Sequence, residues 1–89
     1  MATSLPGSEL IEQGIRDLAS GAETVESLLV SLSAERLRAL GIAVPSAFAD
    51  AELRLYQLLA AQHGDGAHAR YNALIRRVVS FQRAAACAS

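Results

Sequence analysis

The sequence contains one cysteine, no tryptophan, no lysine and no apolar run of membrane-spanning length. A lone thiol at Cys87 cannot form an intrachain disulfide, which excludes a secreted module built on disulfides. The short apolar runs argue against a transmembrane helix and against contact with a membrane. Residues 1–7 carry neither a basic segment nor an apolar stretch of signal-peptide length. We therefore expect a cytoplasmic protein.

Aromatic residues are also scarce, with two tyrosines and two phenylalanines, so Leu, Ile, Val and Ala must fill the core. A chain of 89 residues suffices for one domain. A domain of this size buries only about 60–65% of the surface that its unfolded chain exposes, which leaves its stability marginal. Because a disulfide is excluded, we predict that the domain gains further burial by forming a symmetric homodimer. We expect one helical domain over residues 1–89, with residues 1–7 and 86–89 frayed.

The apolar residues recur at helical spacing nearly everywhere, and no strand-like alternation of useful length occurs. The spacing predicts helices over residues 9–20, 25–32, 34–40, 51–62 and 67–86. Whether residues 31–33 form a break or a bend stays open. The residues expected at the helix starts are Ser8, Thr24, Ser33 and Asp50, and those expected just past helix ends are Gly21 and Gly41. We predict an all-α fold, a compact bundle of four to five helices that ends in an antiparallel helical hairpin.

Charge is distributed unevenly along the chain. Residues 1–35 carry acids against Arg16 alone, whereas residues 66–89 carry arginines and no acid. At 100° per residue, the arginines of the last helix form a basic strip beside its apolar face. We call them the arginine strip and expect them, with two acids of the first helix, to contact a partner: Arg70, Arg76, Arg77, Arg83, Glu9 and Glu12. The acids and the arginines can meet within one chain or between two copies.

The arginine strip also allows an alternative function, a small nucleic-acid-associated regulator of antitoxin type. The isoelectric point of about 6.0 lacks the strong positive charge of sequence-tolerant nucleic-acid binders. A helix-turn-helix does not fit either, because residues 41–49, with Pro45 among them, are too long for its turn. Nucleic acid is therefore a possible partner that we do not favour.

No set of residues has the spacing of a catalytic, metal or cofactor site. His63 and His68 flank Asp65 in a glycine-rich turn, but histidines five residues apart do not share a helical face. No serine lies in a nucleophile elbow, and no glycine-rich phosphate loop is present. We predict a non-enzymatic protein-protein interaction or assembly module without metal or cofactor. A further possibility is an accessory subunit that completes another protein's active site. The bias toward Ala, Leu and Arg is typical of a GC-rich genome, so we expect a small bacterial-type protein.

Overall fold

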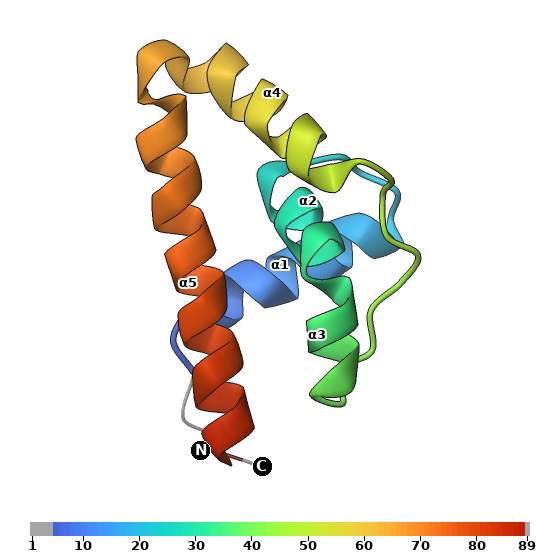
Figure 1. Ribbon diagram of the computed structural model, residues 1–89. Helices are drawn as coiled ribbons and strands as arrows, with labels where there is room; N and C mark the ends of the chain where they lie inside the picture. Colours follow the sequence, from blue (N-terminus) through green and yellow to red (C-terminus); the bar gives the residue numbers. More distant parts are fainter. Residues whose placement is uncertain (1–4, 89) are drawn as a thin grey trace.

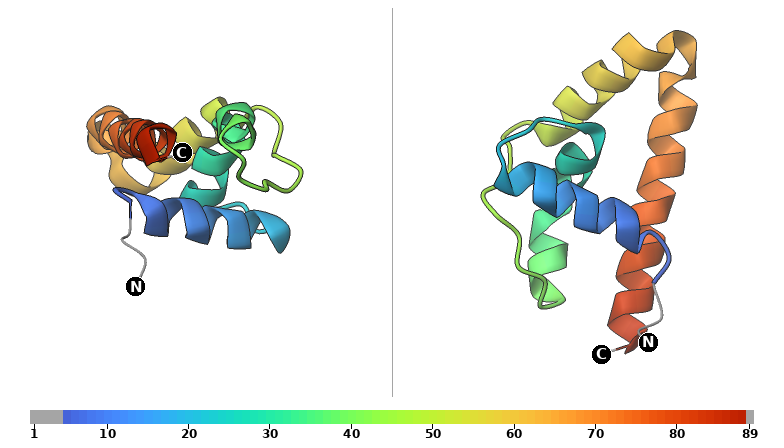
Figure 2. Two further views of the ribbon diagram at one scale, coloured as in Figure 1. Left: turned by 90° about the horizontal axis from the view of Figure 1, so that it is seen from below. Right: turned by 180° about the vertical axis from the view of Figure 1, so that it is seen from behind.

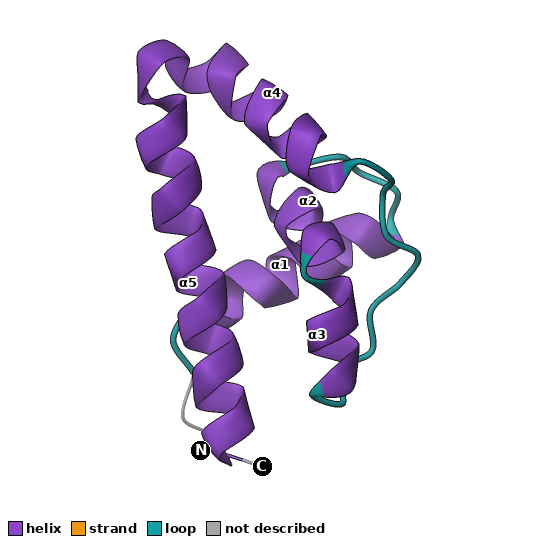
Figure 3. Cartoon of the chain, viewed as in Figure 1, coloured by secondary structure: helices purple, strands orange, loops and turns teal. Residues whose placement is uncertain are grey.

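The computed structural model describes residues 5–88, and those residues form helices and connecting loops without strands (Figures 1 and 3). The elements in chain order are α1 (Ser8–Ala19), α2 (Val25–Leu32), α3 (Ala34–Ala39), α4 (Ala51–His63), the 3₁₀ turn η1 (Gly64–Gly66) and α5 (Ala67–Ala88). The predicted all-α class is confirmed. Helix α5 continues through Ala88, so residues 86–88 are helical here. The fraying expected for residues 1–4 and 89 lies outside the described residues, and fraying elsewhere stays a prediction.

Helix α2 forms the centre of the core. The five consecutive residues 27–31 are all buried, and Leu28, Leu29 and Val30 among them have no solvent exposure, so the middle of α2 is covered on every side. Helix α1 crosses one side of α2, and α4 and α5 pack against other sides (Figure 2). The crossing with α1 is close because Gly14 lies against the backbone of Glu26 and the side chain of Val30.

Several helix ends follow the sequence prediction. The Thr24 hydroxyl accepts a hydrogen bond from the Ser27 amide at 3.0 Å, and the Ser27 hydroxyl accepts one from the Thr24 amide at 2.8 Å, which completes a capping box. Gly41 has a φ of 88°, and the Ile42 amide donates to the Leu37 carbonyl at 3.0 Å. This geometry is a Schellman motif, in which glycine tolerates the left-handed backbone without strain.

Three predicted N-caps behave differently from the expectation. Gly7, rather than Ser8, precedes α1 with a φ of 77°, and a β-carbon at this position would lie 2.9 Å from the Arg77 carbonyl oxygen. Asp50 precedes α4 but adopts a φ of 53°, and its side chain makes no cap hydrogen bond. The Ser33 hydroxyl donates to the Leu29 carbonyl at 2.7 Å instead of capping α3. The interval 31–33 therefore contains a true break, at which α2 ends and α3 begins.

Helices α4 and α5 both extend from η1 toward the same side of the molecule, with opposite chain directions, and they diverge with distance from the turn, as Figure 1 shows. The hairpin encloses α2, which contacts both of its arms. The buried side chains of the hairpin recur at helical spacing: Ala51, Leu55, Leu59, Ala67, Leu74, Val78 and Phe81. The predicted terminal hairpin is thus present, and its inner face completes the core around α2.

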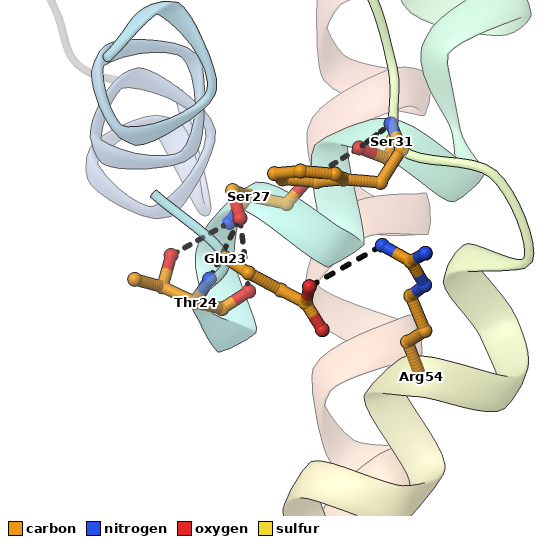
Figure 4. Close-up of polar contacts among 6 residues, drawn as sticks. Glu23, Thr24, Ser27, Ser31 and Arg54 are labelled. Carbon is orange, nitrogen blue, oxygen red and sulfur yellow. Dashed lines mark hydrogen bonds and ion pairs between the residues drawn. The ribbon is translucent and has the colours of Figure 1, made fainter. Parts of the chain in front are cut away.

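The connection over residues 41–50 is held by polar contacts. Ser31 accepts a hydrogen bond from the Phe48 amide at 3.1 Å and donates one to the Ser27 carbonyl at 2.8 Å. Arg54 forms an ion pair with Glu23 at 3.3 Å, which joins the start of α4 to the turn before α2 (Figure 4). Ser31 thus ties the connection to α2 through two hydrogen bonds, and the exposed ion pair adds a contact between Glu23 and the start of α4.

Candidate protein-binding groove

A groove lies between α3 and the C-terminal half of α5, which run beside each other in Figures 1 and 2. It has two adjoining parts, of about 610 and 430 Å³, and both parts are lined by Arg36, Val79 and Gln82. We call this surface the α3–α5 groove. Val78 in its lining is buried, whereas four other apolar side chains of the lining are only partly buried: Leu32, Leu40, Ile75 and Val79. An apolar surface of this kind, open along one side, is typical of a binding site for another polypeptide.

The local sequences of α3 and α5 explain why a groove remains between these two helices. The Schellman motif at Gly41 ends α3 after two turns, and Arg38 donates hydrogen bonds to the carbonyls of Val44 and Pro45 at 3.2 and 3.0 Å. The connection therefore turns back toward α4 instead of crossing to α5. Helix α5 is much longer than α3, with 22 residues against 6, so one face of its C-terminal half remains open beside α3.

Positive charge dominates the lining of the groove. Arg36 on α3 and Arg83 on α5 line the smaller part from opposite walls. Arg38 lines the larger part, and Glu35 is the acid that the described residues contribute. Since the carbonyl partners of Arg38 are neutral, its positive charge is not cancelled. The groove thus combines an apolar floor with a basic rim.

The arginine strip is divided between two surfaces. Arg70 and Arg77 line a separate polar cleft of about 400 Å³, together with His63, Glu23 and Glu26. Arg83 lines the α3–α5 groove, and Arg76 is exposed. The strip therefore does not present one unbroken basic face, because Glu9 pairs with Arg77 and because Glu23 and Glu26 line the same cleft as Arg70.

The two acids expected to meet the strip have different surroundings. Glu9 pairs with Arg77 of the same chain at 2.8 Å, across 68 positions of sequence. Glu12 is exposed and has no hydrogen-bond or ion-pair partner within residues 5–88. One pair of the predicted acidic and basic groups thus meets within a chain.

Sequence reasoning missed an aromatic patch on α4 and α5. The Tyr56 ring lies 5.7 Å from that of Tyr71 and 6.4 Å from that of His68, measured between centroids. Leu53 beside them is 60% exposed and Tyr56 is 40% exposed, the largest values among the big apolar side chains described. The sequence contained a signal for this patch. Leu53 and Tyr56 stand three residues apart, so they share one face of α4, and this face lies outside the buried stripe of the helix.

Tyr71 has a perturbed phenol within this patch. Its hydroxyl donates a hydrogen bond to Oε2 of Glu52 at 3.0 Å. Burial, this hydrogen bond and the negative charge of Glu52 together raise the pKa of Tyr71 above its ordinary value of 10.0. The shift thus favours the protonated phenol, which donates the hydrogen bond to Glu52.

The described residues show few features of other kinds of site. Among residues 5–88, no three His, Cys, Asp or Glu side chains converge as a metal site requires. Cys87 is a free and exposed thiol. No helix in the described part of the chain is long and apolar enough to cross a membrane. Comparisons with protein-family models, with curated proteins and with solved structures give no match.

Proposed function

We propose that the chain is a non-catalytic protein-interaction module that binds its partner in the α3–α5 groove. The observation that carries the proposal is the open apolar floor of the groove, formed by Leu32, Leu40, Ile75 and Val79. Covering partly exposed apolar side chains with a partner removes them from water, and this burial drives association.

The divided arginine strip supports protein binding over the nucleic-acid alternative. A phosphate backbone gains most from an uninterrupted row of cations. Here Glu9 already pairs with Arg77, and Glu23 and Glu26 line the same cleft as Arg70. A nucleic-acid strand that followed the strip would meet these carboxylates.

Homodimer formation is a separate prediction. Its argument is that a chain of this size has a small core, which leaves its stability marginal without further burial.

A display selection tests the proposed function without assuming what the partner is. A library of random 20-residue peptides is selected on the wild-type chain, and the binders are then tested on two tryptophan variants. Ala39→Trp fills the smaller part of the groove from an exposed position on α3. Ala60→Trp makes the same change at an exposed position on α4, outside the groove, and is the matched control.

We expect selected peptides to lose binding to Ala39→Trp and to keep it with Ala60→Trp. Circular dichroism of both variants checks that the helices are intact. A selection that yields no binder, or only binders that tolerate Ala39→Trp, would overturn the assignment of the groove. Binding of a single-stranded oligonucleotide that requires Arg70 and Arg76 would instead favour the nucleic-acid alternative.

A further inference from the structure

The α5 wall of the groove repeats at the spacing of a helix face. Ile75, Val79, Gln82 and Ala86 stand at intervals of four, three and four residues, and all line the groove. At 1.5 Å per residue this stripe is about 16 Å long, or about three helical turns. A groove of this length and composition suits an amphipathic helix, which inserts anchors at i, i+3 or i+4, and i+7.

The charges around the groove favour a partner helix that carries acidic side chains. Arg36 and Arg83 are exposed, lie on opposite walls, and have no hydrogen-bond or ion-pair partner within residues 5–88. A helix seated between these walls would bring the residues on either side of its apolar stripe to the two guanidinium groups. Carboxylates at those positions pair with them, whereas basic residues are repelled.

The same charges argue against a second copy of this chain in the groove. In a symmetric dimer built on this surface, Arg36 and Arg83 of the two chains would lie close together, which costs free energy. The acidic α1 of another copy cannot fill the groove either. Its apolar residues Leu10, Ile11 and Leu18 are buried in the core of its own chain, so insertion would require unfolding.

From these contacts we infer that the α3–α5 groove binds an amphipathic helix of another protein, with Glu and Asp on both sides of its apolar stripe. This inference rests on the proposed function, because it names the partner of the same groove. The apolar stripe provides most of the affinity by burial. The flanking acids provide selectivity and faster association.

Three synthetic 18-residue peptides labelled with fluorescein test the inference by fluorescence anisotropy. All three carry leucines at i, i+4, i+7 and i+11, and the flanking positions hold Glu, Gln or Arg. The protein variants are Arg36→Glu and Arg83→Glu. Arg16→Glu makes the same charge change on α1 at a residue that lines neither part of the groove, and it serves as the control.

We expect the Glu peptide to bind most tightly and the Arg peptide least tightly. Arg36→Glu and Arg83→Glu should each weaken binding of the Glu peptide about fivefold, the size of one partly exposed ion pair. The same variants should strengthen binding of the Arg peptide, and Arg16→Glu should leave the order unchanged. Reversal of peptide preference cannot arise from unfolding, which would weaken all three peptides.

Two results would overturn the inference and leave the proposed function standing. One is equal affinity for the three peptides, with loss of all binding in Ala39→Trp. The other is failure of all three peptides while the display selection yields groove binders of another composition. If neither the peptides nor the selection give binding that depends on the groove, both the inference and the proposed function are wrong.

Discussion

Gly14 of α1 lies so close to Val30 of α2 that a β-carbon at position 14 would overlap the Val30 Cγ2 atom and the Glu26 carbonyl oxygen. Inside a helix, Gly→Ala ordinarily stabilises by about 1 kcal/mol. Here the obstacle includes backbone, which cannot rotate away. We predict that Gly14→Ala lowers the free energy of unfolding by about 1–3 kcal/mol, measured by urea denaturation with circular dichroism.

Gly66 supplies the control for this prediction. A β-carbon there would lie 3.8 Å from the His63 Cβ, an ordinary contact, and the φ of Gly66 is not positive. Gly66→Ala should therefore be neutral or stabilise by up to about 1 kcal/mol, because it restricts the unfolded chain. If both substitutions shifted stability alike, the close approach of α1 and α2 at Gly14 would be disproved.

The capping box at the start of α2 gives a second prediction. The Thr24 hydroxyl accepts from the Ser27 amide and also donates to Oδ2 of Asp17 at 2.7 Å. Thr24→Ala removes both bonds and should cost about 1–2 kcal/mol in thermal or urea unfolding. Thr24→Ser keeps the hydroxyl and should recover most of this loss. An alanine variant as stable as the wild type would show that the box contributes nothing.

A third prediction concerns the phenol of Tyr71 at alkaline pH. Its pKa is raised above 10.0, so the native state binds this proton more tightly than the unfolded chain does. The resulting stability is complete below pH 10 and is lost as pH rises through the pKa of the folded state. Glu52→Gln should lower the pKa of Tyr71, because it removes the negative charge that adds to the effect of burial, the largest cause.

Ultraviolet absorbance of the phenolate measures this titration directly. The chain has two tyrosines, so Tyr56→Phe leaves Tyr71 as the single phenol and keeps an aromatic ring at position 56. The comparison is between Tyr56→Phe and the same protein with Glu52→Gln. An identical midpoint in the two proteins would contradict an influence of Glu52.

The pair formed by Glu9 and Arg77 should contribute little to stability despite its 2.8 Å distance. The two side chains are 73% and 47% exposed, so water and salt screen their attraction. We expect Glu9→Gln to change the free energy of unfolding by less than about 1 kcal/mol, and less still at high salt. Glu12→Gln, at an exposed acid of the same helix, is the control. A larger loss would mean that this contact holds α1 on α5.

The predicted homodimer can be tested by size-exclusion chromatography with light scattering at low and high salt. Because Glu9 already pairs with Arg77 of its own chain, exchanging this pair for one between two copies would gain little free energy. We therefore expect a dimer whose mass is the same at both salt concentrations. A dimer that loosens as salt rises would place other charges between the chains. A monomer at high micromolar concentration would remove the dimer prediction.

The sequence was sufficient to predict the helices, because apolar spacing and glycine positions act locally. Thr24, Gly21 and Gly41 behave as their residue types indicate. The groove was not predictable, because it depends on the distance between α3 and α5. No apolar pattern in the sequence indicates how these two helices are placed relative to each other. The role of Gly14 was not predictable for the same reason. A glycine inside a helix does not indicate which residue packs against it, and only the structure identifies Val30 as that residue.

The order of helix packing has a consequence for how fast the chain folds. Helix α1 packs on α2, α2 on α3, and α4 on α5, so most contacts join segments that are near in sequence, and the packing of α4 and α5 on α2 adds contacts of longer range. Topologies of this kind fold in microseconds to milliseconds. The contact of Gly7 with the Arg77 carbonyl spans nearly the whole chain and must wait for the largest loop to close. We expect it to form last, so that substitutions at Gly7 accelerate unfolding and leave the folding rate almost unchanged.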